Sequence, residues 1–250
     1  MNTPLYNYLL RLGDTSLILG HRLSEWCGHG PVLEEDIAMI NIALDHVGQS
    51  RTLLQYAAEV QGEGKTEDDL AYLRDVLGFK NNLLVEQPNG DFAQTMVRQF
   101  FMDAFLVPLY TQLSESKDET LAGVAMKGIK EATYHLRHSS EWLRRMGDGT
   151  EESNRRAQDA VNFLWRFTED IFTTTQDDKE LAMAGIGVDF STLKPIWSET
   201  VEKVLAEATL THPDTVLTLT GSRDGIHTEH LGFVLADMQF LQRTYPGAEW

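Results

Sequence analysis

The chain has 250 residues, of which 42% are hydrophobic, and a formal net charge of −17. This composition is that of a globular protein with a substantial core, and its acidic balance argues against nucleic acid and anionic membrane surfaces as partners. The single cysteine, Cys27, excludes an internal disulfide, and no apolar run reaches the ~18 residues of a membrane span. Arg11 and Asp14 interrupt the leucines of the N-terminal stretch, which is unlike a signal peptide. We therefore expect a cytoplasmic protein.

Apolar residues recur at helical spacing along most of the chain, and no alternating strand pattern of useful length is present. The predicted helices, in chain order, are residues 5–27, 34–60, a short acidic helix at 67–76, 91–113 with a bend at Pro108, 121–146, 153–173, 191–210 and 228–243. Residues 79–90 are predicted to be extended or irregular, because Pro88 and Asn89-Gly90 disfavour a helix, and residues 211–225 form a looser connection. Long helices joined by short stops predict an all-α, four-helix-type bundle with additional helices, in one domain over residues 1–250.

Four acidic residues fall on helix faces that should be apolar, each on a separate predicted helix: Glu25, Asp45, Asp103 and Glu131. Asp103 is the clearest of them, because its helical neighbours at −7, −3, +3, +4 and +7 are apolar or aromatic. A buried ionised carboxylate costs several kcal/mol unless it is paired, hydrogen-bonded or metal-bound. The four residues therefore need a common explanation.

The pattern alone supports two explanations about equally. In the first, carboxylates and histidines from several helices hold a di-metal centre. In the second, basic side chains neutralise the acids in a core network, and those available are His21, Arg22, Lys127, His135 and His138. A third explanation is that one or more of the acids face solvent at an end of the bundle.

The spacing of the histidines favours a lost metal site. Di-iron bundles use Glu-x-x-His twice, so that carboxylate and imidazole share one helix face. Three residues after Asp45 comes Gly48, and three residues after Glu131 comes Tyr134, so both histidine positions are predicted to be vacant. We therefore predict a relic site, with no metal, cofactor or catalytic residue in this chain.

Other histidines and the cysteine add little to this expectation. His46 lies about 100° around the helix from Asp45 and is not expected to point into the same site. His135 follows Glu131 by four residues and is the one conceivable remaining ligand. The stretch from Ile226 to His230 lacks the His-Glu-x-x-His pattern of a zinc site, and Cys27 is expected to fill space rather than react.

Six runs of the sequence are long and unusual: Arg11-Leu12-Gly13-Asp14, Glu25-Trp26-Cys27-Gly28-His29, Leu44-Asp45-His46-Val47-Gly48-Gln49, Leu83-Leu84-Val85-Glu86-Gln87-Pro88-Asn89-Gly90, Lys130-Glu131-Ala132-Thr133-Tyr134-His135-Leu136-Arg137 and His227-Thr228-Glu229-His230-Leu231-Gly232. In these runs, and from end to end, the chain resembles the C subunits of the bacterial phenylacetyl-CoA epoxidase family. These enzymes are also called ring 1,2-phenylacetyl-CoA monooxygenases.

The resemblance implies a ferritin-like bundle that pairs with a homologous A subunit. In that family the A subunit holds the di-iron centre and binds the acyl-CoA, whereas the C subunit has lost the metal ligands and is a structural partner. The resemblance also implies a small B subunit and a reductase that uses FAD and an iron–sulfur cluster to pass electrons from NADPH. The reaction adds one oxygen atom of O₂ across the aromatic ring.

Two other functions remain open. The chain could itself be a di-iron oxygenase that uses Glu25, Asp45, Asp103 and Glu131 with His135, or it could be an iron store of the ferritin type. The sequence leaves open whether the isolated chain forms a homodimer.

Overall fold

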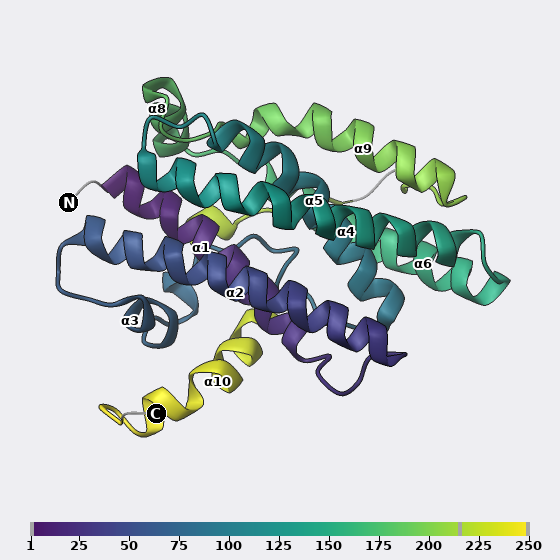
Figure 1. The fold of residues 1–250 in the computed structure, drawn as a ribbon, viewed down its shortest axis with the longest axis horizontal. Coiled ribbons are helices and arrows are strands. Elements are labelled where there is room, and N and C mark those ends of the chain that lie inside the picture. Colours follow the sequence, from purple (N-terminus) through teal and green to yellow (C-terminus); the bar gives the residue numbers. More distant parts are fainter. Residues whose placement is uncertain (1–2, 215–216, 249–250) are drawn as a thin grey trace. The chain divides into compact units, whose positions relative to one another are not determined.

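The computed structural model describes residues 3–214 and 217–248, and the regular structure within them is helical, with no strand. By their internal contacts, two compact units divide the chain: Met1–Pro88 with Gly221–Trp250, and Asn89–Thr220. Each unit contains one pair of long helices joined by a short connection, which is the element from which ferritin-like bundles are built (Figure 1). The predicted all-α, ferritin-like fold class is confirmed, while the single domain over residues 1–250 stays a prediction.

In the first unit, α1 (Thr3–Ser24) and α2 (Leu33–Gln61) pack side by side (Figure 1). Acidic residues in the first turn of α2 complement the helix dipole, and Gly62 ends the helix in the left-handed conformation, with φ of 72°. The close approach of the helices depends on Gly20, because a Cβ there would lie 3.1 Å from Val47 Cγ2 and 3.2 Å from the carbonyl oxygen of Ala43. This contact brings the middle of α2 directly against α1.

The remainder of the first unit consists of α3 (Glu67–Tyr72), the 3₁₀ turns η1 (Val76–Gly78) and η4 (Ser222–Asp224), and α10 (Glu229–Thr244). A capping box between Thr66 and Asp69 begins α3. The predicted helix 67–76 therefore ends four residues early. Helix α10 contacts α1, α3 and η1.

In the second unit, α4 (Phe92–Leu113) and α5 (Glu119–Gly147) form the long pair, and α6 (Glu151–Leu164) and α9 (Lys194–Glu207) pack against both of them. The side chains of Asp91, Asp118 and Thr150 cap the N-termini of α4, α5 and α6, which explains why these helices begin where they do. Pro108 lies inside α4, as predicted.

The structure differs from the sequence prediction between residues 164 and 193. The predicted helix 153–173 stops at Leu164 and continues as the 3₁₀ turn η2 (Trp165–Phe167) and the short α7 (Thr168–Ile171). Helix α8 (Gln176–Ala184) was not predicted, and η3 (Phe190–Leu193) precedes α9. Of the predicted loose connection 211–225, residues 215–216 lie outside the described part of the chain, and the rest is irregular apart from η4.

An aromatic cluster explains the broken helix. Trp165 and Phe172 pack against Trp197 of α9, with ring centroids 5.7 and 5.4 Å away. Trp197 also donates a hydrogen bond from Nε1 to the carbonyl oxygen of Phe101 at 2.8 Å. Packing of these large rings outweighs the helical periodicity of the local sequence.

Candidate functional site

Asp103 lies in the middle of α4, and its side chain is completely buried. Its Oδ1 accepts a hydrogen bond from Nε2 of Gln99, one turn earlier on the same helix, at 2.7 Å, and its Oδ2 lies 2.8 Å from Oγ of Ser139 on α5. Burial raises the pKa of Asp103 to about 8, although the hydrogen bonds from Ser139 and Gln99 oppose this effect. The predicted burial of Asp103 is confirmed, and its carboxyl group is mostly protonated at neutral pH.

The surroundings of Ser139 fit a protonated Asp103 better than an ionised one. The Ser139 hydroxyl lies 2.8 Å from Asp103 Oδ2 and 3.0 Å from the carbonyl oxygen of His135, and it has only one hydrogen to donate. A neutral carboxyl group can donate its own hydrogen to Ser139, which then donates to the carbonyl oxygen, so that both contacts become hydrogen bonds. An ionised carboxylate would leave two acceptors competing for one hydrogen.

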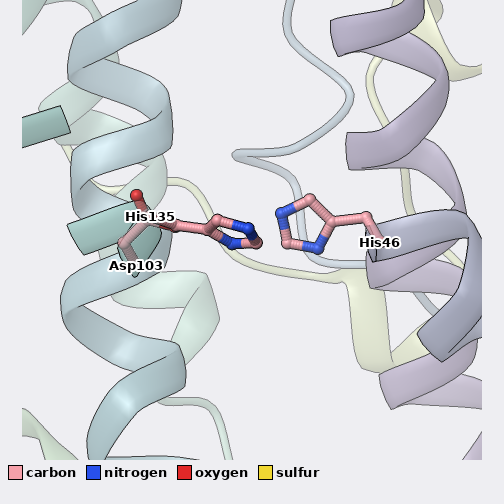
Figure 2. Close-up of side chains that lie close together, drawn as sticks. All are labelled: His46, Asp103 and His135. Atoms are coloured by element: carbon pink, nitrogen blue, oxygen red, sulfur yellow. The ribbon is translucent and has the colours of Figure 1, made fainter. Parts of the chain in front are cut away.

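The buried face of α5 carries His135 and, three residues before it, Ala132, each 1% exposed. Asp103 and His135 lie close together, with a carboxyl oxygen and a ring nitrogen within 4.8 Å of each other (Figure 2). In the spacing of a Glu-x-x-His motif, Ala132 stands where the glutamate would be. On this helix a buried histidine therefore has alanine, and not a carboxylate, three residues before it.

The same spacing of a buried alanine and a buried histidine occurs on α2 of the first unit. His46, the third residue labelled in Figure 2, is completely buried, and Ala43, three residues before it, is 2% exposed. Gly20 of α1 lies over this pair, since a Cβ at that glycine would be 3.3 Å from His46 Cβ. The buried spacing on α2 is thus Ala-x-x-His, as on α5.

The predicted register of α5 was wrong by one residue. Tyr134 is 44% exposed, so it does not occupy an interior ligand position. The Glu131 side chain, only 15% exposed, lies at the edge of the buried face, with Oε1 3.3 Å from Nζ of Lys127. This pair corresponds to the network explanation, in which a basic side chain compensates the acid.

The other acids of the predicted site also lie off the buried face. Asp45 and Gly48 are half-buried, and no atom lies within 4 Å of the position that a Cβ of Gly48 would take. Glu25 is exposed just beyond the end of α1, where its Oε1 lies 2.9 Å from a guanidinium nitrogen of Arg22. The expected burial of Glu25 is wrong. His46 and Asp45 lie on different faces of α2, as expected, but it is His46 that is completely buried.

These residues do not fit the di-iron centre that ferritin-like oxygenases carry. Such a centre needs a glutamate three residues before each histidine, and α2 and α5 have Ala43 and Ala132 there. Asp103, the acid that is fully buried on α4, has a raised pKa and hydrogen bonds at both oxygens.

Comparison with known proteins identifies the family of this chain. A family model described as "Phenylacetic acid catabolic protein" matches residues 1–250. The chain belongs to this family. It is 53% identical over 243 residues to the C subunit of the 1,2-phenylacetyl-CoA epoxidase of Escherichia coli (strain K12), and the match covers 97% of this chain and 98% of that relative. The family resemblance predicted from the sequence is confirmed.

Two of the sequence runs that carry this family resemblance meet inside the first unit. Residues 79–88 are irregular, as predicted, yet several of them are completely buried. Glu86 in this segment contacts the start of α10: its Oε2 lies 2.9 Å from Nδ1 of His227, and its Oε1 accepts a hydrogen bond from the backbone N–H of Thr228 at 2.6 Å. Asn81 donates to Oε2 at 3.0 Å.

His227 is held between two acceptors. Its Nε2 lies 3.0 Å from the carbonyl oxygen of Phe79, and neither its side chain nor that of Glu86 is exposed. The two ring nitrogens therefore face a carboxyl oxygen of Glu86 and a backbone carbonyl oxygen, and these contacts fix the orientation of the ring. The sequence analysis excluded a zinc site at His227 and did not predict its contact with Glu86. It did note both runs, 83–90 and 227–232, as unusual.

The remaining sequence expectations concern Cys27 and the membrane. Cys27 is a free cysteine on the surface, so it does not fill interior space, and that expectation was wrong. Among the described residues, no helix combines the length and the apolar character needed to cross a bilayer.

Proposed function

We propose that this chain is the non-catalytic structural subunit of a multicomponent di-iron oxygenase that epoxidises the ring of phenylacetyl-CoA. One observation carries the proposal: alanine stands at the buried position three residues before the interior histidine on both α2 and α5. The relative in Escherichia coli is named as one subunit of a 1,2-phenylacetyl-CoA epoxidase, and this name supports membership of a multisubunit complex.

The interior of the second unit supports a structural role. Asp103, Gln99 and Ser139 form a hydrogen-bonded set in which a neutral carboxyl group joins α4 to α5. Such a set contributes to stability and to the alignment of the two helices. In this proposal, the buried polar residues of α4 and α5 stabilise the contact between the two helices and take no part in a reaction.

In this proposal the chain pairs with a homologous catalytic A subunit, which holds the di-iron centre and the acyl-CoA. A small B subunit and a reductase with FAD and an iron–sulfur cluster complete the complex, and NADPH supplies the electrons. The complex is proposed to be cytoplasmic, where a reducing medium keeps the exposed thiol of Cys27 free. The isolated chain could still form a homodimer.

Substitution of His135 in the reconstituted complex tests the proposal. We expect His135→Gln to leave the rate of phenylacetyl-CoA epoxidation per assembled complex within about twofold of wild type, because the residue holds no metal in this chain. His138→Gln, on the same helix but half-buried, serves as the matched control, and size-exclusion chromatography measures the amount of complex. A loss of about 100-fold or more with the complex intact would favour the alternative, in which this chain is itself a di-iron oxygenase.

A further inference from the structure

A groove with a volume of about 570 Å³ lies between α5 and α9, which contact each other in the second unit (Figure 1). Residues at helical spacing on one face of each helix line it. Three of the lining residues are basic, Arg137 and Arg144 on α5 and Lys203 on α9, and one, Glu199 on α9, is acidic. The groove therefore gathers positive charge on a chain whose formal net charge is −17.

Two of these three cations are not compensated by an acid. Arg144 has an acidic partner, because its Nε and Nη2 both lie 2.7 Å from Oε2 of Glu207. Arg137 lies over the ring of Tyr134, with its Cζ 5.5 Å from the ring centroid, and this contact does not neutralise its charge. In the part of the chain that the structure describes, no carboxylate forms an ion pair with Arg137 or Lys203. These two side chains can therefore bind an anion.

The other lining residues suit the uncharged part of an organic ligand. Leu136 and Val204 supply apolar surface, and Ile196 is 44% exposed. Glu199, one turn before Lys203 on α9, can accept hydrogen bonds from hydroxyl groups. The volume of the groove lies within the ~300–1,000 Å³ of small-molecule sites and is far larger than a single phosphate ion requires.

We propose that this groove binds a phosphate ester with an organic body of about nucleoside size. Arg137 supplies a planar guanidinium fork that matches the geometry of phosphate oxygens, and Lys203 supplies a second positive charge from the opposite wall. A phosphate ester close to dianionic balances both charges, whereas a carboxylate would balance one. Leu136 and Val204 contact the body, and Glu199 accepts hydrogen bonds from its hydroxyl groups. The inference does not depend on the proposed function.

Calorimetric titration of the full-length chain at low ionic strength tests the inference with three probes. AMP combines a phosphate ester with a nucleoside, adenosine is the nucleoside alone, and inorganic phosphate is the anion alone. We expect AMP to bind at least about tenfold more tightly than inorganic phosphate, and adenosine to show no measurable binding at the same concentrations. Binding of AMP should weaken as the salt concentration rises, because part of the attraction is between charges near the surface.

The variant Arg137→Gln/Lys203→Gln removes the two cations that no acid compensates. Arg145→Gln/Lys179→Gln is the matched control, because it also removes one arginine and one lysine from exposed positions of the second unit, both outside the groove. All four side chains are exposed, so circular dichroism and thermal unfolding should show an unchanged fold for both variants. We expect the groove variant to bind AMP at least about tenfold more weakly, and the control to bind within about twofold of wild type.

Three results would overturn the inference. The first is the absence of AMP binding to the wild-type chain at millimolar concentrations. The second is equal affinity of the groove variant and the wild-type chain for AMP, which would place the binding of AMP outside the groove. The third is equal affinity of the wild-type chain for AMP and inorganic phosphate, which would show that the groove holds a phosphate ion without an organic body.

Discussion

Asp103 shows how one buried side chain decides the chemistry available to its surroundings. The carboxyl group lies among apolar and aromatic residues of α4, with Gln99 and Ser139 as its hydrogen-bonding neighbours. Burial disfavours the charged form more than these two neighbours favour it, so the pKa rises from 3.8 to about 8. The neutral group acts as a hydrogen-bonding link between α4 and α5.

The raised pKa predicts how stability changes with pH. Between pH values near the unfolded pKa of 3.8 and the folded pKa of about 8, the folded chain binds more protons at Asp103 than the unfolded chain does. The free energy of unfolding therefore falls as pH rises through this window, by at most ~1.4 kcal/mol per pH unit from this group, and stops falling above the folded pKa.

The variant Asp103→Asn should remove this dependence, because the amide has no proton to lose. In urea unfolding, we expect the variant to gain roughly 2–3 kcal/mol relative to wild type on going from about pH 5.5 to about pH 8. Parallel stability curves for the two proteins over this range would show that Asp103 titrates normally.

Sequence reasoning identified Asp103 correctly but chose the wrong register on α5, for a physical reason. It took the acid Glu131 as the inward position, whereas small residues mark the buried face: Ala125, Gly128, Ala132 and Ser139 recur at three, four and seven residues. A strict count of helical periodicity would have found this face and, with it, the interior position of His135. The hydrogen bonds of Asp103 needed the packed structure.

At the scale of elements, the long helices were predictable because caps and apolar periodicity agree along them. The failures lie between residues 164 and 193, where Trp165 and Phe172 leave the helix to pack against Trp197, a contact between residues far apart in sequence. Helix α8 did have a local signal, the capping box of Thr175 and Asp178 followed by Gly185. The packing of Trp165 and Phe172 against Trp197, by contrast, has no signal in the local sequence.

The contact between residues 79–88 and the start of α10 is the other element that sequence reasoning could not assemble. Glu86 accepts hydrogen bonds from the backbone of Thr228 and from Asn81, and it faces the His227 ring. These groups anchor α10 to a segment that has no regular structure of its own. Two of the runs that carry the family resemblance, 83–90 and 227–232, thus contact each other in the folded chain.

The variant Glu86→Gln should weaken this anchor. The amide nitrogen of the glutamine would replace a carboxyl oxygen that now accepts a hydrogen bond, so it would face at least one N–H donor. The variant would also lack the carboxylate that faces His227. We therefore expect the free energy of unfolding to fall by roughly 3 kcal/mol. Glu229→Gln, on the exposed first turn of α10, is the control and should change it by less than about 0.5 kcal/mol. Equal stabilities of the two variants in urea unfolding would refute the anchor.

At the scale of the whole molecule, the two units share one arrangement on their long helices. His46 in the first unit and His135 in the second are buried, and each has a buried alanine three residues before it. A di-iron bundle would have glutamate at these two positions.

Metal analysis of the isolated chain tests the central claim most directly. The chain would be purified without its partners, incubated with excess Fe(II) without oxygen, freed of unbound metal, and measured for iron per chain. We predict well below one iron per chain, and no oxygen-dependent turnover of phenylacetyl-CoA when the reductase is added. About two bound irons per chain together with such turnover would contradict the claim that this subunit is structural.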